Sequence, residues 1–284
     1  DSSAIKIMKN LYKKFVKDTN SIIVMDSTSA ELTKYAANSI LACRISFINE
    51  IANLAEKVGA NIEDIKNGVG SDQRIGKSFL NAGCGYGGSC FPKDVAALQK
   101  LSKEITGESL KIIDATIEVN KNQKNVLYKK IIERFNGNIK DKNIAIWGLS
   151  FKPDTDDMRE APSIELINKL YSKGVNIHAY DPVAMKEAKI IFKDAPIKYK
   201  KNKEACLKNA DALVIVTEWN EFKNPDFEKI SNLMKSPIIF DGRNVLNAKK
   251  ILKESHSIEY YPIGKPNIVP INGEKLPESL KKVK

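Results

Sequence analysis

Four short hydrophobic runs in the second half of the chain constrain its fold more than any other feature. The runs are NIAIWGL (143–149), VNIHAYDP (175–182), DALVIVTEW (211–219) and SPIIFDGR (236–243), and a helical pattern at 163–174 separates the first two. Continuous apolar runs of this length are typical of strands that are buried on both faces. Their alternation with helices predicts an α/β architecture, with a C-terminal Rossmann-like, doubly wound parallel sheet over residues 138–262.

In such a sheet the ligand binds at the carboxyl ends of the strands, where polar side chains follow each run. No G-x-G-x-x-G follows the first run, where the sequence is GLSFKPDTDD, so a nucleotide held by Lys and Arg side chains is an equal alternative. Asp181 matches the ribose-binding acid of a dinucleotide fold, but a structural turn aspartate before Pro182 explains it as well. The candidates at these strand ends are Lys152, Asp181, Glu218, Asp241 and Arg243.

The first half of the chain has helical periodicity. A pattern without Pro or Gly runs from residue 29 to 58, and further helical patterns at 61–69, 91–105 and 109–135 predict a central all-helical domain over residues 29–137. A helix of about thirty residues with apolar positions on more than one face predicts a homodimer interface.

The two ends of the chain have separate predictions. A helical pattern at 4–17 and the run SIIVMD at 21–26 predict that residues 1–28 are the remnant of a second Rossmann domain. A lone strand needs a partner, so it either joins a sheet elsewhere or follows residues that are missing. Residues 263–284 lack periodicity and predict an extended, basic tail.

The stretch NAGCGYGGSCFPKD (81–94) places Cys90 between a glycine-rich loop and a predicted helix start, where Pro92 suits the first turn. The helix dipole and Lys93 favour a thiolate there, which predicts a nucleophile; a buried structural cysteine is the alternative. Asp94 lies one turn on, where it could orient a water or accept a proton. Cys84 is either an inert neighbour or a resolving thiol.

The net charge of +11, from 46 Lys and Arg against 35 Asp and Glu, predicts an anionic partner. No basic stripe or nucleic-acid module is present, so a phosphorylated small molecule is favoured over nucleic acid. No run is long enough to span a membrane and the N-terminus does not resemble a signal peptide, so we expect a cytoplasmic protein without membrane partners. With two His and four irregularly spaced Cys, no metal site and no disulfide framework are expected.

Five blocks of the sequence resemble the family of UDP-glucose and GDP-mannose dehydrogenases. They are ELTKYAANSILACRISFINE (31–50), DQRIG (72–76), GYGGSCFPKD (85–94), GLSFKPDTDDMRE (148–160) and FDGRN (240–244). FPKD, DQRIG and TEW (217–219) are similar to the UDP-glucose 6-dehydrogenase branch. GDP-mannose or other nucleotide-sugar 6-dehydrogenases, and a non-catalytic nucleotide-sugar-binding or dimerisation fragment, are the alternatives.

The resemblance implies the NAD-dependent, four-electron oxidation of UDP-glucose to UDP-glucuronate through a thiohemiacetal and a thioester on Cys90. It implies Lys34, Asn38 and Asp94 as the other catalytic residues; Lys34 and Asn38 lie one helical turn apart and can reach a single oxygen. For NAD it implies Lys93 and Arg159, although a salt bridge within DTDDMRE explains Arg159 equally well. The implied substrate residues are Phe79, Leu80, Asn81, Tyr86, Gly87, Phe151, Lys152, Arg243 and, from the neighbouring subunit, Arg74.

Members of this family begin with an NAD-binding domain that carries G-x-G-x-x-G, and no such motif precedes Asp1 here. Either the chain is a fragment, or the first domain is a separate or lost segment. We therefore expect the chain alone to bind UDP-sugar weakly and to turn over little substrate.

Overall fold

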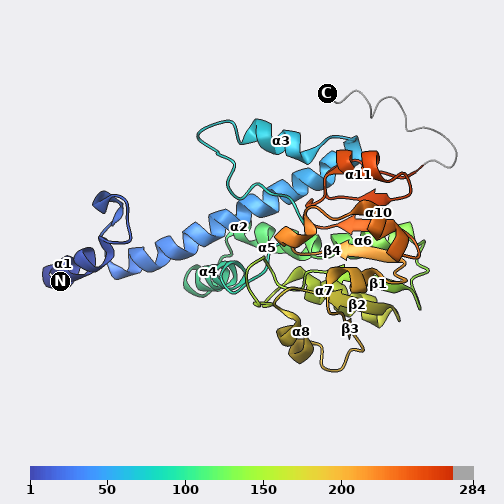
Figure 1. The fold of residues 1–284 in the computed structure, drawn as a ribbon. Coiled ribbons are helices and arrows are strands. Elements are labelled where there is room, and N and C mark those ends of the chain that lie inside the picture. The colour runs from blue at the N-terminus through green and yellow to red at the C-terminus, as the bar shows by residue number, and fades with distance from the viewer. Residues whose placement is uncertain (271–284) are drawn as a thin grey trace.

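The computed structural model describes residues 1–270 and combines a helical part with a six-stranded sheet (Figure 1). The helical part has one long helix, α2, against which three shorter helices of the same part pack. It comprises α1 (Ser2–Tyr12), the 3-10 turn η1 (Thr19–Ser21), α2 (Ser27–Val58), α3 (Ile62–Val69), α4 (Phe91–Thr106), α5 (Lys111–Gln123) and α6 (Val126–Arg134).

The sheet confirms the predicted doubly wound α/β architecture. Its strands lie in the order β3-β2-β1-β4-β5-β6 and all pair in parallel, so the chain reverses its winding direction between β1 and β4. The strands are β1 (Asn143–Trp147), β2 (Asn176–Tyr180), β3 (Lys198–Tyr199), β4 (Ala212–Ile215), β5 (Ile238–Asp241) and β6 (Glu259–Tyr261).

Helices cover both faces of the sheet, as the continuous apolar runs predict. Alternate strand residues face α6 and α7 on one side, where Ile144 and Ile146 belong to the larger core. Ala145 and Trp147, between them, belong to a second core with α9, α10 and α11. The helices after β1 are α7 (Pro162–Ser172), α8 (Met185–Ile191), α9 (Lys203–Leu207), the 3-10 turn η2 (Asn220–Phe222), α10 (Phe227–Leu233) and α11 (Ala248–Glu254).

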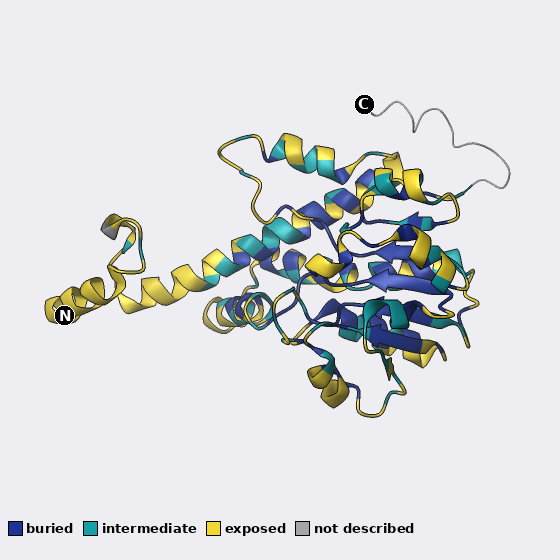
Figure 2. Cartoon of the chain, in the orientation of Figure 1, coloured by how far each residue is buried: buried dark blue, intermediate teal, exposed yellow. Residues whose placement is uncertain are grey.

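Helix α2 connects the two parts of the molecule. Asp26 caps its first turn through a bond to the N–H of Ser29, and Gly59 ends it in the left-handed conformation. Its second half packs into the sheet core through Ile48 and Ala52, whereas its first half is mostly exposed (Figure 2). Even so, none of the helices in residues 1–270 is both long and apolar enough to cross a membrane.

The strand predicted at residues 21–26 does not form. Ile23 and its neighbours follow η1 as exposed irregular chain, because none of the six strands lies beside them to complete a ladder. The preceding helix is also shorter than predicted and ends at Tyr12. The helical pattern at 109–135 forms two helices, α5 and α6, rather than one.

Part of the predicted tail is folded. Residues 263–270 run back along the sheet, where Ile263 is buried and Ile268 forms a bridge with Tyr260 of β6. Gly264 accepts a bond from the N–H of Ile62 at 2.8 Å, which fastens this segment to the start of α3. Residues 271–284 lie outside the described residues.

Gly264→Ala is expected to destabilise the fold by about 3 kcal/mol, because its φ is positive and a Cβ would lie 2.7 Å from the Cβ of Ala52. Gly107→Ala is the control: Gly107 also has a positive φ, but nothing lies within 4 Å of its Cβ position. Gly107→Ala is expected to lower the free energy of unfolding by about 1 kcal/mol, and urea unfolding measures both variants. Equal losses in the two variants would contradict the packing of residues 262–270 on α2.

Candidate functional site

The glycine-rich loop at 81–90 lies between the helical part and the carboxyl edge of the sheet. The N–H of Cys84 donates to the carbonyl of Gly242 at 2.8 Å, just after β5. The N–H of Gly88 donates to the carbonyl of Arg159 at 2.7 Å, in the loop after β1. The loop therefore meets the edge at which a doubly wound sheet binds its ligand.

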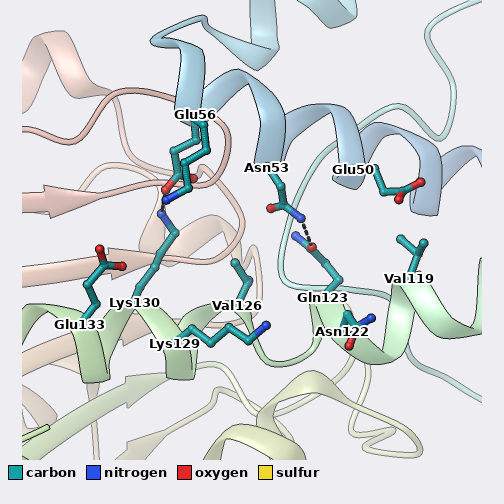
Figure 3. Close-up of a pocket in the computed structure, with 11 residues that line it drawn as sticks. Glu50, Asn53, Glu56, Val119, Asn122, Gln123, Val126, Lys129, Lys130 and Glu133 are labelled. Atoms are coloured by element: carbon teal, nitrogen blue, oxygen red, sulfur yellow. Dashed lines mark hydrogen bonds and ion pairs between the residues drawn. The ribbon is translucent and has the colours of Figure 1, made fainter.

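Buried amide side chains hold the other side of this loop. Asn49 of α2 accepts a bond from the N–H of Gly83 at 2.9 Å, and Gln123 of α5 donates to the carbonyl of the same glycine at 2.7 Å. Gln123 also accepts from Asn53 across the groove between α2 and α5 (Figure 3). Our sequence interpretation missed these amides, although Asn120 and Gln123 continue the buried face of α5 and so carry a signal.

Cys90 stands at the start of α4, as predicted. It is the N-cap residue, Phe91 is the first residue of the helix, and Pro92 lies in the first turn. The Cys90 thiol is exposed, whereas Cys84 is fully buried and burial raises the pKa of its thiol. The enclosed position of Cys84 favours the inert alternative over a resolving thiol.

Asp94, one turn into α4, is the centre of a polar cluster. Its side chain is 0% exposed, and Lys34 and Asn38 of α2 both donate to its Oδ2, at 2.8 and 2.6 Å. Lys93 lies 3.0 Å from Oδ1. The two α2 residues thus converge on one oxygen of Asp94.

This cluster fixes the charge of Asp94. Burial by itself would raise the pKa of Asp94, but hydrogen bonds from Lys34, Asn38 and Lys93 outweigh it and lower the pKa to about 2. The bond to Asp94 in turn raises the pKa of Lys34, and Cys90 adds a smaller contribution in the same direction. An ammonium, a carboxylate and a thiol are therefore grouped at the start of one helix.

Asp94 should stabilise the fold above its usual pKa of 3.8, and this contribution should be lost as the pH falls toward about 2. Stability is lost on acidification because the folded state stabilises the ionised form of Asp94, so that this carboxyl group binds a proton less readily than it does in the unfolded chain. The difference in unfolding free energy between the native protein and Asp94→Asn is expected to be constant from about pH 5 to pH 8 and to shrink below about pH 4. Urea titrations across this range measure it, and a difference that grows on acidification would refute the assigned charge.

Aromatic residues and close glycine contacts surround the loop. The rings of Phe79 and Tyr86 both meet Phe91 edge-on, with centroids 6.0 and 5.9 Å away. At Gly87 a Cβ would lie 2.3 Å from the carbonyl oxygen of Glu160. The ring of Phe151 covers Gly88 in the same way, so neither glycine has room for a side chain.

The remaining candidates for the substrate differ in exposure. Leu80 is buried in the larger core, so only its main chain is available to a ligand. Asn81 is exposed, and the Lys152 ammonium lies over the ring of Phe151 at 5.4 Å. Arg74 is 88% exposed and pairs with Asp72. The guanidinium of Arg74 therefore bonds Asp72, its neighbour in the loop after α3, and is otherwise open to solvent.

Arg243 approaches the loop from the sheet. Its guanidinium donates to the carbonyl of Val216 at 2.9 Å, and Glu218 lies 3.3 Å away. A Cβ on Gly83 would come within 3.0 Å of this guanidinium. Arg243 thus joins the carboxyl ends of β4 and β5 to the cysteine loop.

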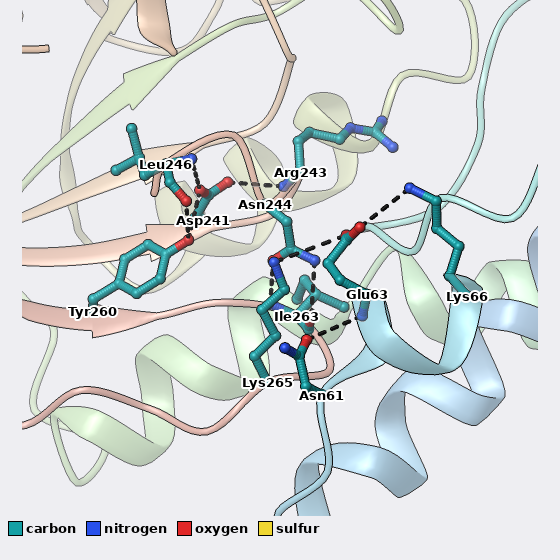
Figure 4. A network of polar contacts seen from close by, with 10 residues as sticks. All are labelled: Asn61, Glu63, Lys66, Asp241, Arg243, Asn244, Leu246, Tyr260, Ile263 and Lys265. Carbon is teal, nitrogen blue, oxygen red and sulfur yellow. Dashed lines mark hydrogen bonds and ion pairs between the residues drawn. The ribbon is translucent and has the colours of Figure 1, made fainter. Parts of the chain in front are cut away.

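Asp241 holds the turn that carries Arg243. This buried carboxylate accepts bonds from the N–H groups of Arg243 and Leu246 and from the hydroxyl of Tyr260 (Figure 4). Burial raises the pKa of Asp241, against the effect of these bonds. The Arg243 side chain points away from this network, and its guanidinium bonds the carbonyl of Val216 and pairs with Glu218 instead.

The Asp181 carboxylate binds main-chain N–H groups in the loops after β1 and β2. It is fully buried and accepts bonds from the N–H groups of Leu149, Ser150, Val183 and Ala184 and from the indole of Trp219. These partners occupy both oxygens, so the turn alternative fits and the ribose-binding alternative does not. Arg159 pairs with Asp157 at 2.7 Å, as the salt-bridge alternative expects, but its side chain is largely exposed.

Two profiles of one protein family match this chain. The central domain of the UDP-glucose/GDP-mannose dehydrogenase family matches residues 28–122, and the UDP binding domain of the same family matches residues 145–248. A UDP-glucose 6-dehydrogenase of Rhizobium meliloti is 40% identical over 94% of this chain and 60% of its own length. One of Bacillus subtilis is 43% identical over 95% and 60%.

Solved structures of similar enzymes share the fold. A UDP-glucose dehydrogenase of Pyrobaculum islandicum has a TM-score of 0.81 and 31% identity, over 93% of this chain and 56% of its own. A UDP-D-ManNAc dehydrogenase of Pyrococcus horikoshii has a TM-score of 0.75 and 26% identity, over 93% and 58%. The chain spans about three fifths of the length of the curated relatives it matches. Since the two profiles together cover more than half of it, the chain belongs to the UDP-glucose/GDP-mannose dehydrogenase family and carries the central and UDP-binding parts.

Proposed function

We propose that this protein takes part in the NAD-dependent oxidation of UDP-glucose at the sugar C6 to UDP-glucuronate, with Cys90 as the nucleophile. The observation that carries the proposal is the cluster at the start of α4. An exposed thiol stands there one turn before a buried carboxylate that binds Lys34 and Asn38. The curated relatives that bear the name UDP-glucose 6-dehydrogenase support this choice of substrate.

The described residues fit part of an NAD site. Arg159 and Lys93 present exposed cations near the cysteine loop, and such groups suit the phosphates of a dinucleotide. The sheet itself does not offer a dinucleotide pocket, since Asp181 is fully engaged and no glycine fingerprint follows β1. NAD would supply the hydride acceptor in both oxidation steps, and the remaining chemistry belongs to the residues of the chain.

The alcohol first loses a hydride and a proton to give an aldehyde. The Cys90 thiolate then forms a C–S bond to the aldehyde carbon, and the oxygen takes up a proton to complete a thiohemiacetal. Loss of a second hydride and a proton leaves a thioester. Water adds to its carbonyl, the C–S bond breaks, and the carboxylate and the free thiolate are released together with two protons that pass to the solvent.

Lys34 and Asp94 have different tasks in this scheme. The side chain of Lys34 is 60% exposed, and its ammonium can donate to the oxygen that becomes negative when sulfur or water attacks. Asp94 has a pKa of about 2, which makes it a weak proton acceptor at neutral pH. We assign to Asp94 the orientation of Lys34, Asn38 and the attacking water rather than the uptake of a proton.

The stoichiometry of the reaction tests this proposal. The protein to assay is the one expressed from the complete reading frame that contains this chain. With it, UDP-glucose should yield two NADH per UDP-glucuronate, measured by absorbance at 340 nm and by chromatography of the nucleotide sugars. GDP-mannose at the same concentration should react at least about a hundredfold more slowly. One NADH per product, or a preference for GDP-mannose, would reject the proposed reaction or its substrate.

We also propose that α2 carries a homodimer contact. Ile40, Phe47 and Leu54 are exposed along this helix, and an apolar groove beside Ile40 and Cys43 is completed by Leu110 and Ile112. Burial of such a face against a second copy would remove apolar surface from water. Light scattering should give twice the mass of one chain, and Ile40→Lys should give a monomer.

A further inference from the structure

The side-chain amide of Asn120, on α5, hydrogen-bonds the main chain of one residue of the cysteine loop in the way a neighbouring strand would. Its side chain is only 6% exposed, and both halves of its amide bond the main chain of Tyr86. Oδ1 accepts from the N–H of Tyr86 at 2.9 Å, and Nδ2 donates to the carbonyl of Tyr86 at 3.1 Å. A residue of an antiparallel strand would offer the same pair of bonds. The conformation of Tyr86 therefore depends on one side chain.

Tyr86 passes this restraint on to the start of α4. Its ring meets the ring of Phe91 edge-on, at an interplanar angle of 87°. Phe91 is the first residue of α4 and directly follows Cys90. Close packing leaves the loop no slack beside Asn120, because a Cβ on Gly85 would lie 3.1 Å from its Oδ1. Contacts thus run from Asn120 through Tyr86 and Phe91 to the residue that carries the thiol.

We propose that Asn120 is a positioning residue that holds Cys90 at the start of α4, beside Lys34, through Tyr86 and Phe91. The inference rests on the proposed function only in taking Cys90 as the nucleophile. No other residue type of this size offers one acceptor and one donor on the same planar group. An aspartate would keep the acceptor but would set a second oxygen against the carbonyl of Tyr86.

The alkylation rate of Cys90 by iodoacetamide measures this positioning without substrate or cofactor. Asn120→Asp is compared with Asn122→Asp, which makes the same chemical change at an exposed position of α5. Because Cys90 is already exposed, a slower reaction in the variant does not report a loss of access for the reagent. In Asn120→Asp the rate at pH 7.5, followed by peptide mass spectrometry, should fall about fivefold, and Asn122→Asp should match the native protein.

Two further readouts separate positioning from a general loosening of the fold. Buried Cys84 should stay unmodified in every variant, because the fold that encloses it stays closed. If Asn120→Asp does not fold, Phe91→Leu takes its place, since Phe91 is only half-buried and the change removes its ring contacts with Tyr86 and Phe79. Phe91→Leu should also slow alkylation of Cys90.

An unchanged alkylation rate of Cys90 in a folded variant would overturn the proposal. Equal alkylation of Cys84 and Cys90 would overturn it as well. Failure of the proposed function would look different. In that case NADH formation would be absent from the native protein, while the alkylation rates of Cys90 would still separate Asn120→Asp from Asn122→Asp. The two hypotheses therefore have independent tests.

Discussion

In the protein expressed from the complete reading frame, replacing Cys90 by alanine should lower NADH formation from UDP-glucose by at least about a thousandfold, because no other exposed group at the start of α4 can form the thioester. Binding of UDP-glucose should stay within about twofold of the native value, since the side chain removed is small and exposed. Calorimetry gives the affinity and absorbance at 340 nm gives the rate.

Cys43→Ala is the matched control for this experiment. Cys43 lies on α2, is partly exposed, and makes no contact in the Asp94 cluster. Its replacement should leave the rate within about twofold of the native value. A Cys90→Ala variant that keeps the native rate would remove Cys90 from the mechanism.

Asp94→Asn should lower kcat about a hundredfold with a smaller change in KM, because the substitution removes the charge that orients Lys34 and the attacking water. The fold should survive the change. An amide oxygen can still accept from Lys34 and Asn38, and Lys34 is exposed enough to be hydrated without a partner.

Asp114→Asn provides the comparison for that variant. Asp114 is a half-buried carboxylate of α5 that accepts bonds from Gln99 and Ser109 and has no bond to the cysteine loop. It should retain at least about half of the native kcat. Equal losses in the two variants would mean that Asp94 acts on stability and not on the reaction.

The sequence predicted the parts of the site that are local along the chain. The four strands, the long helix and the start of α4 at Cys90 depend on runs of neighbouring residues, and each forms close to its predicted position. The resemblance and the spacing of Lys34 and Asn38 predicted that both reach one oxygen of the substrate, and this stays a prediction. In the structure both side chains bind Oδ2 of Asp94, a residue of a different helix.

Other features depend on partners that are distant in sequence. Asn49, Asn120 and Gln123 are ordinary helix residues until the cysteine loop folds against them. The edge strands β3 and β6 are only two and three residues long, too short to leave a periodic signal. The run at 21–26 has the opposite property: its local pattern is that of a strand, but the sheet places no partner beside it.

A covalent intermediate on Cys90 would be the most direct evidence that this cysteine is the nucleophile. The reaction of Asp94→Asn with UDP-glucose and NAD is quenched in acid, and the peptide that contains Cys90 is examined by mass spectrometry. We predict a UDP-glucuronyl thioester on Cys90 that hydroxylamine removes, since the variant should slow hydrolysis and let the thioester accumulate. Continued formation of UDP-glucuronate with Cys90 unmodified at every time point would contradict the account.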